Sequence, residues 1–304
     1  MKKTRYLLLL VIGALAVTDQ ARAYDAAYPE RWPKGQVVFH LLLGNPPAVL
    51  QDGSTSWDQV AGQALERWNQ YLDRIHFVTA APPVNSVTFG DGRNSASWGL
   101  TADGNPFGTN TAAITRTRFV NDVIVESDVY FNTARSWNSY RGIQQLGIVD
   151  FRRVALHEFG HAFGLDHPDG AGQAVEAIMN ANVSDVDDLR ADDINGAKAL
   201  YGNLLHSAVD LGGGWYWFEQ LGNINLASYD VAADQGWVYH LKLGWLYLTH
   251  SGEGNIYWWD LTNGWQYTSL TGFPYLYNFA TNSWWFFDTN SGLPGQRWFF
   301  DFGS

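Results

Sequence analysis

The chain has 304 residues, enough for two domains, and 46% of them are hydrophobic, so it can bury a sizeable core. Its 30 acidic and 19 basic residues give a formal net charge of −11, which excludes a general electrostatic attraction for nucleic acid or anionic lipid. It contains no cysteine, which excludes disulfides and a lipoprotein anchor.

The amino-terminal end has the pattern of a secretory signal peptide. A basic start, an apolar run and a cleavage site between small residues follow one another: Lys2, Lys3 and Arg5, then Tyr6 to Val17, then Ala21-Arg22-Ala23. The apolar run is too short to span a bilayer comfortably, and a retained anchor is the alternative. Removal of this segment would leave 15 basic and 29 acidic residues. We therefore expect a secreted or extracellular protein, either free or associated with the cell surface, without a membrane span in the mature chain.

The first elements of the mature chain are a strand and a long helix. The apolar, β-branched-rich run from Gln36 to Leu43 predicts the strand. Ser56 then offers a helix N-cap, with Gln59 three residues further on as a capping-box partner. Apolar residues follow at helical spacing, at Val60, Ala64, Trp68 and Tyr71. The pattern predicts a helix that continues to about Asp73.

The next segment reads as strands separated by a long loop. Val87-Thr88-Phe89 is predicted as a short strand. Residues 90–112 are rich in Gly, Asn, Ser and Thr, a composition typical of a loop. Two more strands are predicted, from Ala112 to Phe119 and from Val123 to Asn132, because apolar and polar residues alternate there as in a half-buried sheet.

The most informative stretch is residues 157–167, which read His-Glu-Phe-Gly-His-Ala-Phe-Gly-Leu-Asp-His. It lies at the end of a helix predicted from Ile148 to Gly164. His157 and His161 are four residues apart, so on a helix they share one face and can bind one zinc ion. The alternative is that they are ordinary polar residues of an amphipathic helix. Five fixed positions match by chance about once in ten thousand chains of this length, which favours the metal site.

Three further residues complete the predicted catalytic centre. Gly164 can adopt a backbone conformation that ends the helix and turns the chain back, which would bring His167 to the metal as a third ligand. Three protein ligands leave the fourth position open for water, the arrangement of a catalytic zinc site. Glu158 stands next to the first ligand and is the candidate general base.

These residues resemble the zinc signature of the metzincin metalloproteases, and the Gly-Leu-Asp-His ending is most similar to the matrixin branch. Metzincins carry a Met-turn beneath the metal, and Ala177-Ile178-Met179-Asn180 fits it, with Met179 as the supporting residue. No tyrosine follows at the position where astacins and serralysins have one, which argues against those branches. Asp192 through Gly202 resembles the last helix of matrixin catalytic domains. The resemblance covers about residues 32–202.

The resemblance implies an α+β fold, with a twisted mixed sheet and three helices, and a secreted zinc endopeptidase that acts on extracellular proteins or peptides. It implies one catalytic Zn²⁺ held by His157, His161 and His167. It also implies that an edge strand at Thr111 to Ile114 pairs with extended substrate. Asn180 to Val183 would line the pocket for the substrate side chain beyond the cut.

Matrixins often hold a structural zinc and calcium in the loop before the substrate-binding strands. Here no histidine lies between His76 and His157, which argues against a second zinc site. A calcium site that uses Asp103 or Asp122 stays open, beside the alternative that these are solvated loop residues. The lack of cysteine also removes the cysteine switch by which many matrixins keep their zinc blocked.

The composition changes after Gly202. Residues 205–304 hold 10 of the 15 tryptophans, and their only Lys or Arg residues are Lys242 and Arg297. Short aromatic stretches recur between Gly and Asn residues, at Gly236–Tyr239, Gly244–Tyr247, Tyr257–Asp260, Gly264–Tyr267, Trp284–Asp288 and Trp298–Asp301. The pattern predicts an all-β aromatic-repeat module made of hairpins. Its rings either form the core or stand exposed, where they would stack on the sugars of cell-wall or extracellular glycans.

The chain is thus divided into a signal peptide at 1–23, a matrixin-like zinc metalloprotease domain at 24–204 and an aromatic-rich β-repeat module at 205–304. The predicted function is that of a zinc-dependent endopeptidase. The alternative is a surface adhesion or glycan-binding protein whose protease domain is subsidiary or inactive.

Overall fold

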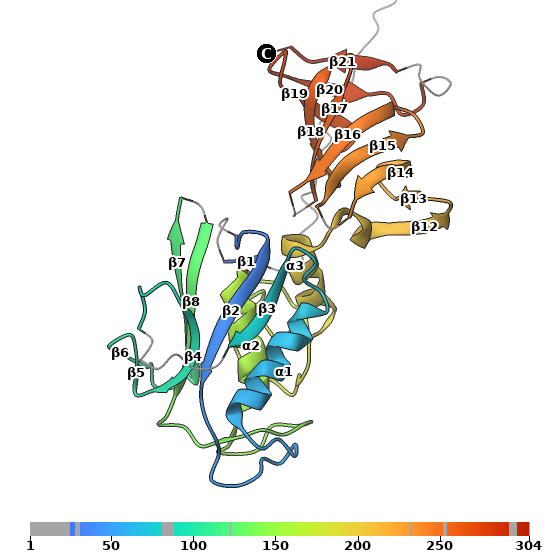
Figure 1. Cartoon of the computed structure of the whole chain (residues 1–304). Coiled ribbons are helices and arrows are strands. Elements are labelled where there is room, and N and C mark those ends of the chain that lie inside the picture. Colours follow the sequence, from blue (N-terminus) through green and yellow to red (C-terminus); the bar gives the residue numbers. More distant parts are fainter. Residues whose placement is uncertain are drawn as a thin grey trace, which may run out of the picture.

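The structure is a computed structural model that describes residues 25–27, 31–80, 88–121, 123–231, 233–251, 254–291 and 297–303. Within these ranges a five-stranded mixed sheet with helices is followed by a ten-stranded antiparallel sheet (Figure 1). The predicted α+β class and the all-β carboxy-terminal region are therefore confirmed. The predicted signal peptide lies outside the described residues, and the division of the chain at residue 204 stays a prediction.

The first body is built on a sheet with the strand order β3-β2-β4-β8-β7. Strands β3, β2, β4 and β8 run parallel, whereas β7 pairs antiparallel with β8 and forms one edge. The strands are β2 (Gly35–Leu42), β3 (Ile75–Ala80), β4 (Asn94–Gly99), β7 (Ala113–Val120) and β8 (Val123–Asn132). Short two-stranded pairs surround it: β1 (Asp25–Ala26) with β11 (Leu165–Asp166), β5 (Thr101–Ala102) with β6 (Asn105–Pro106), and β9 (Trp137–Asn138) with β10 (Val149–Asp150).

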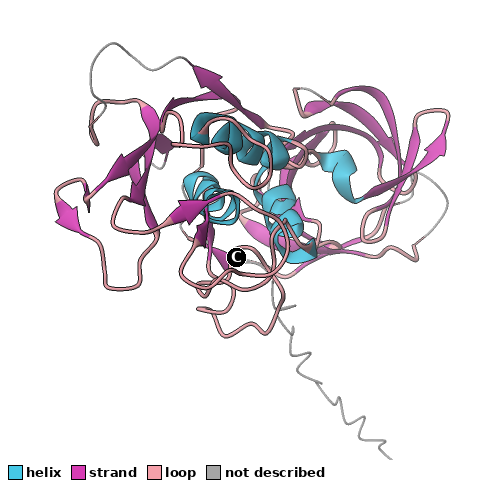
Figure 2. Cartoon of the chain, turned by 90° about the horizontal axis from the view of Figure 1, so that it is seen from below, coloured by secondary structure: helices cyan, strands magenta, loops and turns pink. Residues whose placement is uncertain are grey.

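Three α-helices gather on one side of this sheet (Figures 1 and 2). They are α1 (Trp57–Asn69), α2 (Phe151–Phe163) and α3 (Ala191–Tyr201), and a short 3₁₀ helix, η1 (Leu204–Ser207), follows them. Ser56 caps α1 as predicted, since its hydroxyl accepts the backbone N–H of Gln59 at 3.0 Å. The helix ends at Asn69, earlier than expected. No helix of the described ranges is both long and apolar enough to cross a bilayer.

Aromatic side chains pack α1 and α2 together and onto the sheet. Phe39 of β2 lies edge-on to Phe159 of α2, with ring centroids 5.4 Å apart. Trp68 of α1 meets Phe163 of α2 at 4.8 Å and donates its indole N–H to the Leu156 carbonyl at 2.9 Å. These rings are fully buried, so burial of apolar area fixes α2 against the sheet.

The prediction for residues 87–112 was partly wrong. Thr88 and Phe89 lie outside any strand, and Val87 lies outside the described residues. The stretch predicted as a loop contains β4, a central strand of the sheet. Its buried Asn94 is hydrogen-bonded on both ends of the amide, to the Val38 carbonyl and from the Ser127 N–H, each at 2.9 Å. This strand is held by polar pairing, so it lacks the apolar alternation on which the prediction relied.

The second body is a meander in which each strand pairs antiparallel with the next. Its strands are β12 (Ala208–Gly212), β13 (Trp215–Phe218), β14 (Gly222–Asp230), β15 (Gln235–His240), β16 (Gly244–His250), β17 (Asn255–Asp260), β18 (Gly264–Ser269), β19 (Tyr275–Asn278), β20 (Ser283–Phe287) and β21 (Phe299–Asp301). The six aromatic stretches singled out in the sequence coincide with β15 to β18, β20 and β21. One face forms a separate core that includes Val238, Leu246, Ile256 and Trp258.

The two bodies are joined by a polar cluster beside the chain connection. Arg74, which precedes β3, forms an ion pair with Asp234 at 2.8 Å and donates to the His250 carbonyl at 2.8 Å. Asp234 is buried and also accepts from the Tyr229 hydroxyl at 2.5 Å and from His250 Nδ1 at 2.9 Å. The charge of Asp234 is thus compensated within this cluster.

Candidate metal centre and cleft

Helix α2 is fixed at both ends by features visible in the sequence. At its start, the Asp150 carboxylate accepts the backbone N–H groups of Arg152 and Tyr140, each at 3.2 Å. At its end, Gly164 has a φ of +111°, in the left-handed region that favours glycine. The chain then turns back along β11, which pairs with β1. This turn carries His167 back to the helix.

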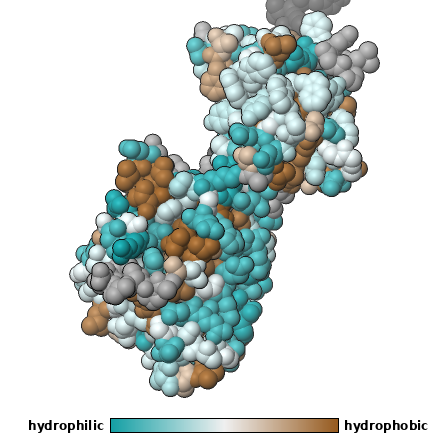
Figure 3. Space-filling view, viewed as in Figure 1, coloured by the Kyte–Doolittle hydropathy of each residue, from teal (hydrophilic) through white to brown (hydrophobic). Residues whose placement is uncertain are grey.

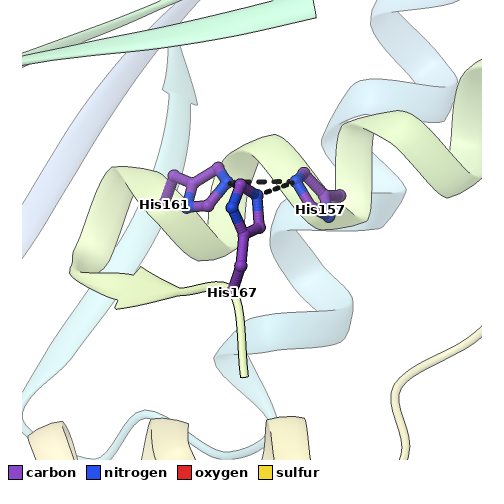
Figure 4. A group of neighbouring side chains, drawn as sticks. All are labelled: His157, His161 and His167. Atoms are coloured by element: carbon purple, nitrogen blue, oxygen red, sulfur yellow. Dashed lines mark hydrogen bonds between the residues drawn. The ribbon is translucent and has the colours of Figure 1, made fainter. Parts of the chain in front are cut away.

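The three predicted ligands lie together in the structure (Figure 4). Nε2 of His161 lies 3.0 Å from Nε2 of both His157 and His167, and the remaining Nε2–Nε2 distance is 3.1 Å. Nδ1 of His157 faces the Ile178 carbonyl at 2.9 Å, and Nδ1 of His161 faces the Leu165 carbonyl at 2.7 Å. A carbonyl can only accept, so these Nδ1 atoms carry the protons and the Nε2 atoms present lone pairs.

Lone pairs that converge at 3 Å repel one another unless a cation lies between them. A zinc ion about 2.0–2.1 Å from each nitrogen fits this triangle. Burial lowers the pKa of all three histidines, and the charge of His157 lowers that of His161 and His167 further. The imidazoles are therefore neutral near pH 7, the form that binds metal. The donor set fits the zinc predicted from the motif.

Glu158 lies in the same cleft and contacts the edge strand. The Thr115 hydroxyl of β7 donates to Glu158 Oε2 at 2.7 Å. Glu158 is 6% exposed, and burial raises the pKa of its carboxyl group to about 7, although the Thr115 hydrogen bond and His167 act in the opposite direction. A carboxyl group poised near neutral pH can both accept and return a proton.

Behind the ligands, α3 holds the segment that contains Met179. Asp193 of α3 accepts three backbone N–H groups, from Ile178 at 2.9 Å, Met179 at 3.1 Å and Arg190 at 2.7 Å. The carbonyl of Ile178 faces Nδ1 of His157, so Asp193 positions the His157 ring through the backbone. Met179 packs where Gly160 has no side chain, since a Cβ on Gly160 would lie 2.3 Å from the Met179 sulfur.

A cavity of about 660 Å³ opens over the histidines. Its walls are β7 with the residues before it, α2 with His167, and the segment 177–186. Both segments expected to contact substrate lie along it, residues 111–114 and 180–183. Ala27, which follows β1, also lines it.

Sequence reasoning missed three residues of the site and its surroundings: Thr115, Asp193 and Arg153. Only Asp193 had a local signal, because it lies three residues after the N-cap Arg190 and can accept its N–H. Of the calcium candidates, Asp103 lies 3.5 Å from Arg116, and Asp122 lies outside the described residues. The calcium site and the roles assigned to Glu158, Gly164, Met179 and the three histidines stay predictions.

The fold and the three-histidine centre define a zinc metallopeptidase domain of the metzincin type. Residues 31–202, more than half of the chain, match the matrixin family, and the chain belongs to it.

The chain is similar to vertebrate matrix metalloproteinases. It is 37% identical to interstitial collagenase of Equus caballus over 81 residues, which cover 26% of this chain and 15% of that protein. It is 28% identical to matrix metalloproteinase-25 of Homo sapiens over 110 residues, 36% of this chain and 19% of that protein. It is 26% identical to matrix metalloproteinase-18 of Xenopus laevis over 190 residues, 61% of this chain and 36% of that protein. The matches thus span about a third or less of these relatives.

Proposed function

We propose that the protein is a secreted zinc-dependent endopeptidase that hydrolyses peptide bonds of extracellular proteins. The observation that carries the proposal is the convergence of three Nε2 atoms within 3.1 Å beside a buried glutamate, in one cleft of a matrixin domain. Secretion is inferred from the pattern of Lys2 to Ala23 alone.

His157, His161 and His167 would hold the zinc ion, which when bound supplies Lewis acidity toward the scissile carbonyl and the attacking water. Glu158 accepts a proton from the water as the carbonyl is attacked, and then returns it to the leaving nitrogen. The Thr115 hydroxyl fixes the orientation of this carboxyl group. The outer edge of β7 offers backbone groups that an extended substrate can pair with.

The test compares the wild-type protein with Glu158→Ala. We expect equal zinc content in both, and a loss of casein or gelatin hydrolysis by about 10²–10⁴-fold in the variant, because the general base is removed while the ligands remain. A chelator should abolish the wild-type activity. The proposal fails if Glu158→Ala keeps wild-type activity, or if the zinc-loaded wild type leaves every protein substrate intact.

A second candidate function belongs to the carboxy-terminal sheet, which has one face we call the aromatic face. It comprises the solvent-facing positions of β15 to β20: Gln235, Trp237, Tyr239, Trp245, Tyr247, Thr249, Asn255, Tyr257, Trp259, Trp265, Tyr267, Ser269, Tyr275, Tyr277, Trp284 and Phe286. None of these residues is charged, and their rings form cross-strand ladders, such as Trp237, Tyr247, Trp259 and Trp265. The side of this body seen in Figure 3 is mainly pale, the colour of intermediate hydropathy. Rings with hydroxyl and amide neighbours and no charge suit neutral sugars.

Binding to insoluble neutral glycans tests this candidate in the Glu158→Ala protein, which would not digest itself. We expect the double variant Trp237→Ala/Trp265→Ala to bind at least about tenfold more weakly, because stacking is lost at both ends of this ladder. Trp217→Ala is the matched control, since Trp217 is similarly exposed but lies on β13, away from the ladder. Equal binding by all three proteins would refute a glycan site on the aromatic face.

A further inference from the structure

The exposed tryptophans of the aromatic face follow a regular pattern. In the described strands β15 to β20, the tryptophans that are 40–56% exposed are Trp237, Trp245, Trp265 and Trp284. Trp245, Trp265 and Trp284 lie on β16, β18 and β20, and we call these three residues the tryptophan line. Trp237 stands to one side of it, on β15. The strand register gives the spacing of the line.

The first step of the line, from Trp245 to Trp265, covers two strands and two residues. Tyr247 follows Trp245 by two residues on β16. It is in register with Trp259 of β17, which is in register with Trp265 of β18. With strands about 4.8 Å apart and a rise of about 3.4 Å per residue, this step is about 12 Å long.

The second step, from Trp265 to Trp284, repeats the first. Tyr267 follows Trp265 by two residues on β18. It is in register with Tyr277 of β19, which is in register with Trp284 of β20. Because neighbouring strands of the meander are antiparallel, β16, β18 and β20 run in the same direction, so both steps point the same way. The three tryptophans therefore lie on one diagonal at equal intervals, about 24 Å from end to end.

Each ring of the tryptophan line is packed against a tyrosine at a steep angle. Ring centroids lie 5.4–6.5 Å apart and the interplanar angles are 64–88° in the pairs Tyr239–Trp245, Tyr247–Trp265 and Tyr277–Trp284. Such contacts hold an indole ring in one orientation before a ligand arrives, which reduces the side-chain entropy lost on binding. The three rings are therefore preorganised for stacking.

The spacing and chemistry of the tryptophan line favour one class of ligand. Sugars stack their flat faces on indole rings, and rings at equal intervals suit a polymer with a regular repeat. In an extended β-1,4-linked chain each sugar is turned over relative to the one before it, so every second sugar presents the same face. A step of about 12 Å is close to the length of about two such sugars. The side chains between the tryptophans are all uncharged, which favours a neutral polysaccharide: Tyr247, Trp259, Tyr267 and Tyr277.

We propose that the tryptophan line binds a linear, uncharged, β-1,4-linked polysaccharide that runs diagonally across β16 to β20. Every second sugar of the bound segment stacks on one tryptophan, so about five sugars cover the whole line. The proposal rests on the glycan-binding function of the aromatic face and adds the class of glycan, its direction on the sheet and the residues that hold it. It does not depend on the peptidase function.

The experiment titrates the Glu158→Ala protein with soluble β-1,4-linked oligomers of two, four and six sugars, one series made of glucose and one of N-acetylglucosamine. Two sugars reach one tryptophan of the line, four reach two, and six reach all three. For at least one series we expect calorimetry to show an affinity that rises at each length and is at least about tenfold higher for six sugars than for two. The two series distinguish the sugars that the site accepts.

Variants at the centre and at an end of the line should differ in a defined way. Adding Trp265→Ala leaves two rings about 24 Å apart, so four sugars should bind no better than two. Adding Trp284→Ala leaves one adjacent pair, so four sugars should keep their advantage over two, while six should bind no better than four. Trp217→Ala is the control, since Trp217 is 42% exposed on β13, outside the line. It should keep the affinities of the Glu158→Ala protein at every length.

The outcomes separate this proposal from the glycan-binding function. Equal affinity for all lengths, equal effects of Trp265→Ala and Trp284→Ala, or binding to insoluble glycans but to neither oligomer series would overturn the tryptophan line and leave glycan binding intact. A folded protein that binds no neutral glycan, soluble or insoluble, would overturn the glycan-binding function itself. Thermal unfolding shows whether each variant is folded. If Trp265→Ala does not fold, the length series of the Glu158→Ala protein with and without Trp284→Ala decides.

Discussion

Asp193 shows how one side chain connects a distant helix to the metal centre. Its carboxylate accepts three backbone N–H groups, and two of them belong to Ile178 and Met179 beside His157. The carbonyl of Ile178 faces His157 Nδ1, so the orientation of that ring depends on Asp193. Such outer partners set the tautomer and direction of a histidine ligand.

We predict that Asp193→Asn lowers zinc affinity by about 10–100-fold and stability by about 2–4 kcal/mol, because an amide cannot accept all three N–H groups. Competition with a chromogenic chelator and urea unfolding measure the two effects.

Asp192→Asn is the control. Burial and the neighbouring charge of Asp193 raise the pKa of Asp192 to about 6. At pH 7 the ionised Asp192 carboxylate is therefore less favourable in the folded protein than in the unfolded chain. The neutral amide should leave zinc affinity unchanged and should not lower stability at pH 7. Equal zinc affinity of wild type and Asp193→Asn would contradict the role given to Asp193.

Among single residues, the sequence predicted those that belong to the histidine motif. It missed those that reach the site from distant parts of the chain. His157, Glu158, His161 and His167 lie within eleven positions, so spacing alone groups them. Thr115 is 43 residues from Glu158, and Asp193 is 15 residues from Ile178. Thr115 meets the site only through the packing of β7, which no local pattern encodes. The position of Asp193 after Arg190 marks the start of α3 but does not indicate its contacts with Ile178 and Met179.

At the scale of elements, α2 is shaped by what it packs against as well as by helix propensity. Gly160 lies between His157 and His161 in α2, where glycine costs about 1 kcal/mol relative to alanine in an isolated helix. In the folded protein the missing Cβ makes room for the buried Met179 sulfur. Packing therefore outweighs propensity at this position.

We predict that Gly160→Ala destabilises the protein by about 1–3 kcal/mol, although helix propensity alone predicts the opposite sign. Thermal or urea unfolding of the single variant checks the sign. In a double-mutant cycle, Met179→Ala should relieve the clash, so that adding Gly160→Ala to Met179→Ala costs less than adding it to the wild type. Additive effects would show that the two residues do not compete for space.

Elements with apolar periodicity were predictable, and those held by polar contacts were not. β2, α1, β8 and α2 appeared close to their expected ranges because their buried residues recur at the period of a strand or helix. β7 also appeared close to its expected range, although Ala113 is its only buried residue. β4 was missed because Asn94 and Ser95 are buried through hydrogen bonds, the latter to Asp128 at 2.6 Å. β3 was not predicted at all, although Ile75 and Phe77 are buried at alternate positions.

At the scale of the whole molecule, the two bodies have separate cores and share the polar cluster around Asp234. We predict that residues 24–204 alone bind one zinc ion and cleave casein with the kcat/KM of the full chain. Removal of the second body exposes Arg74 to water. This should lower the free energy of unfolding by about 1 kcal/mol or less. Metal analysis and a casein assay on the shortened protein test this. A shortened protein that is unfolded or metal-free would show that the proposed boundary at residue 204 is wrong.

The meander has a consequence for how the carboxy-terminal part can vary. Every strand from β12 to β21 pairs only with its neighbours in sequence, so no long-range pairing closes the sheet within the described residues. Gain or loss of a whole hairpin would change the number of rings in a cross-strand ladder while each remaining hairpin kept its partners, as in linear arrays whose stability is a sum over adjacent units. If the aromatic face binds an extended glycan as proposed, duplication or deletion of a short stretch of the coding sequence would adjust the avidity without any change in α2.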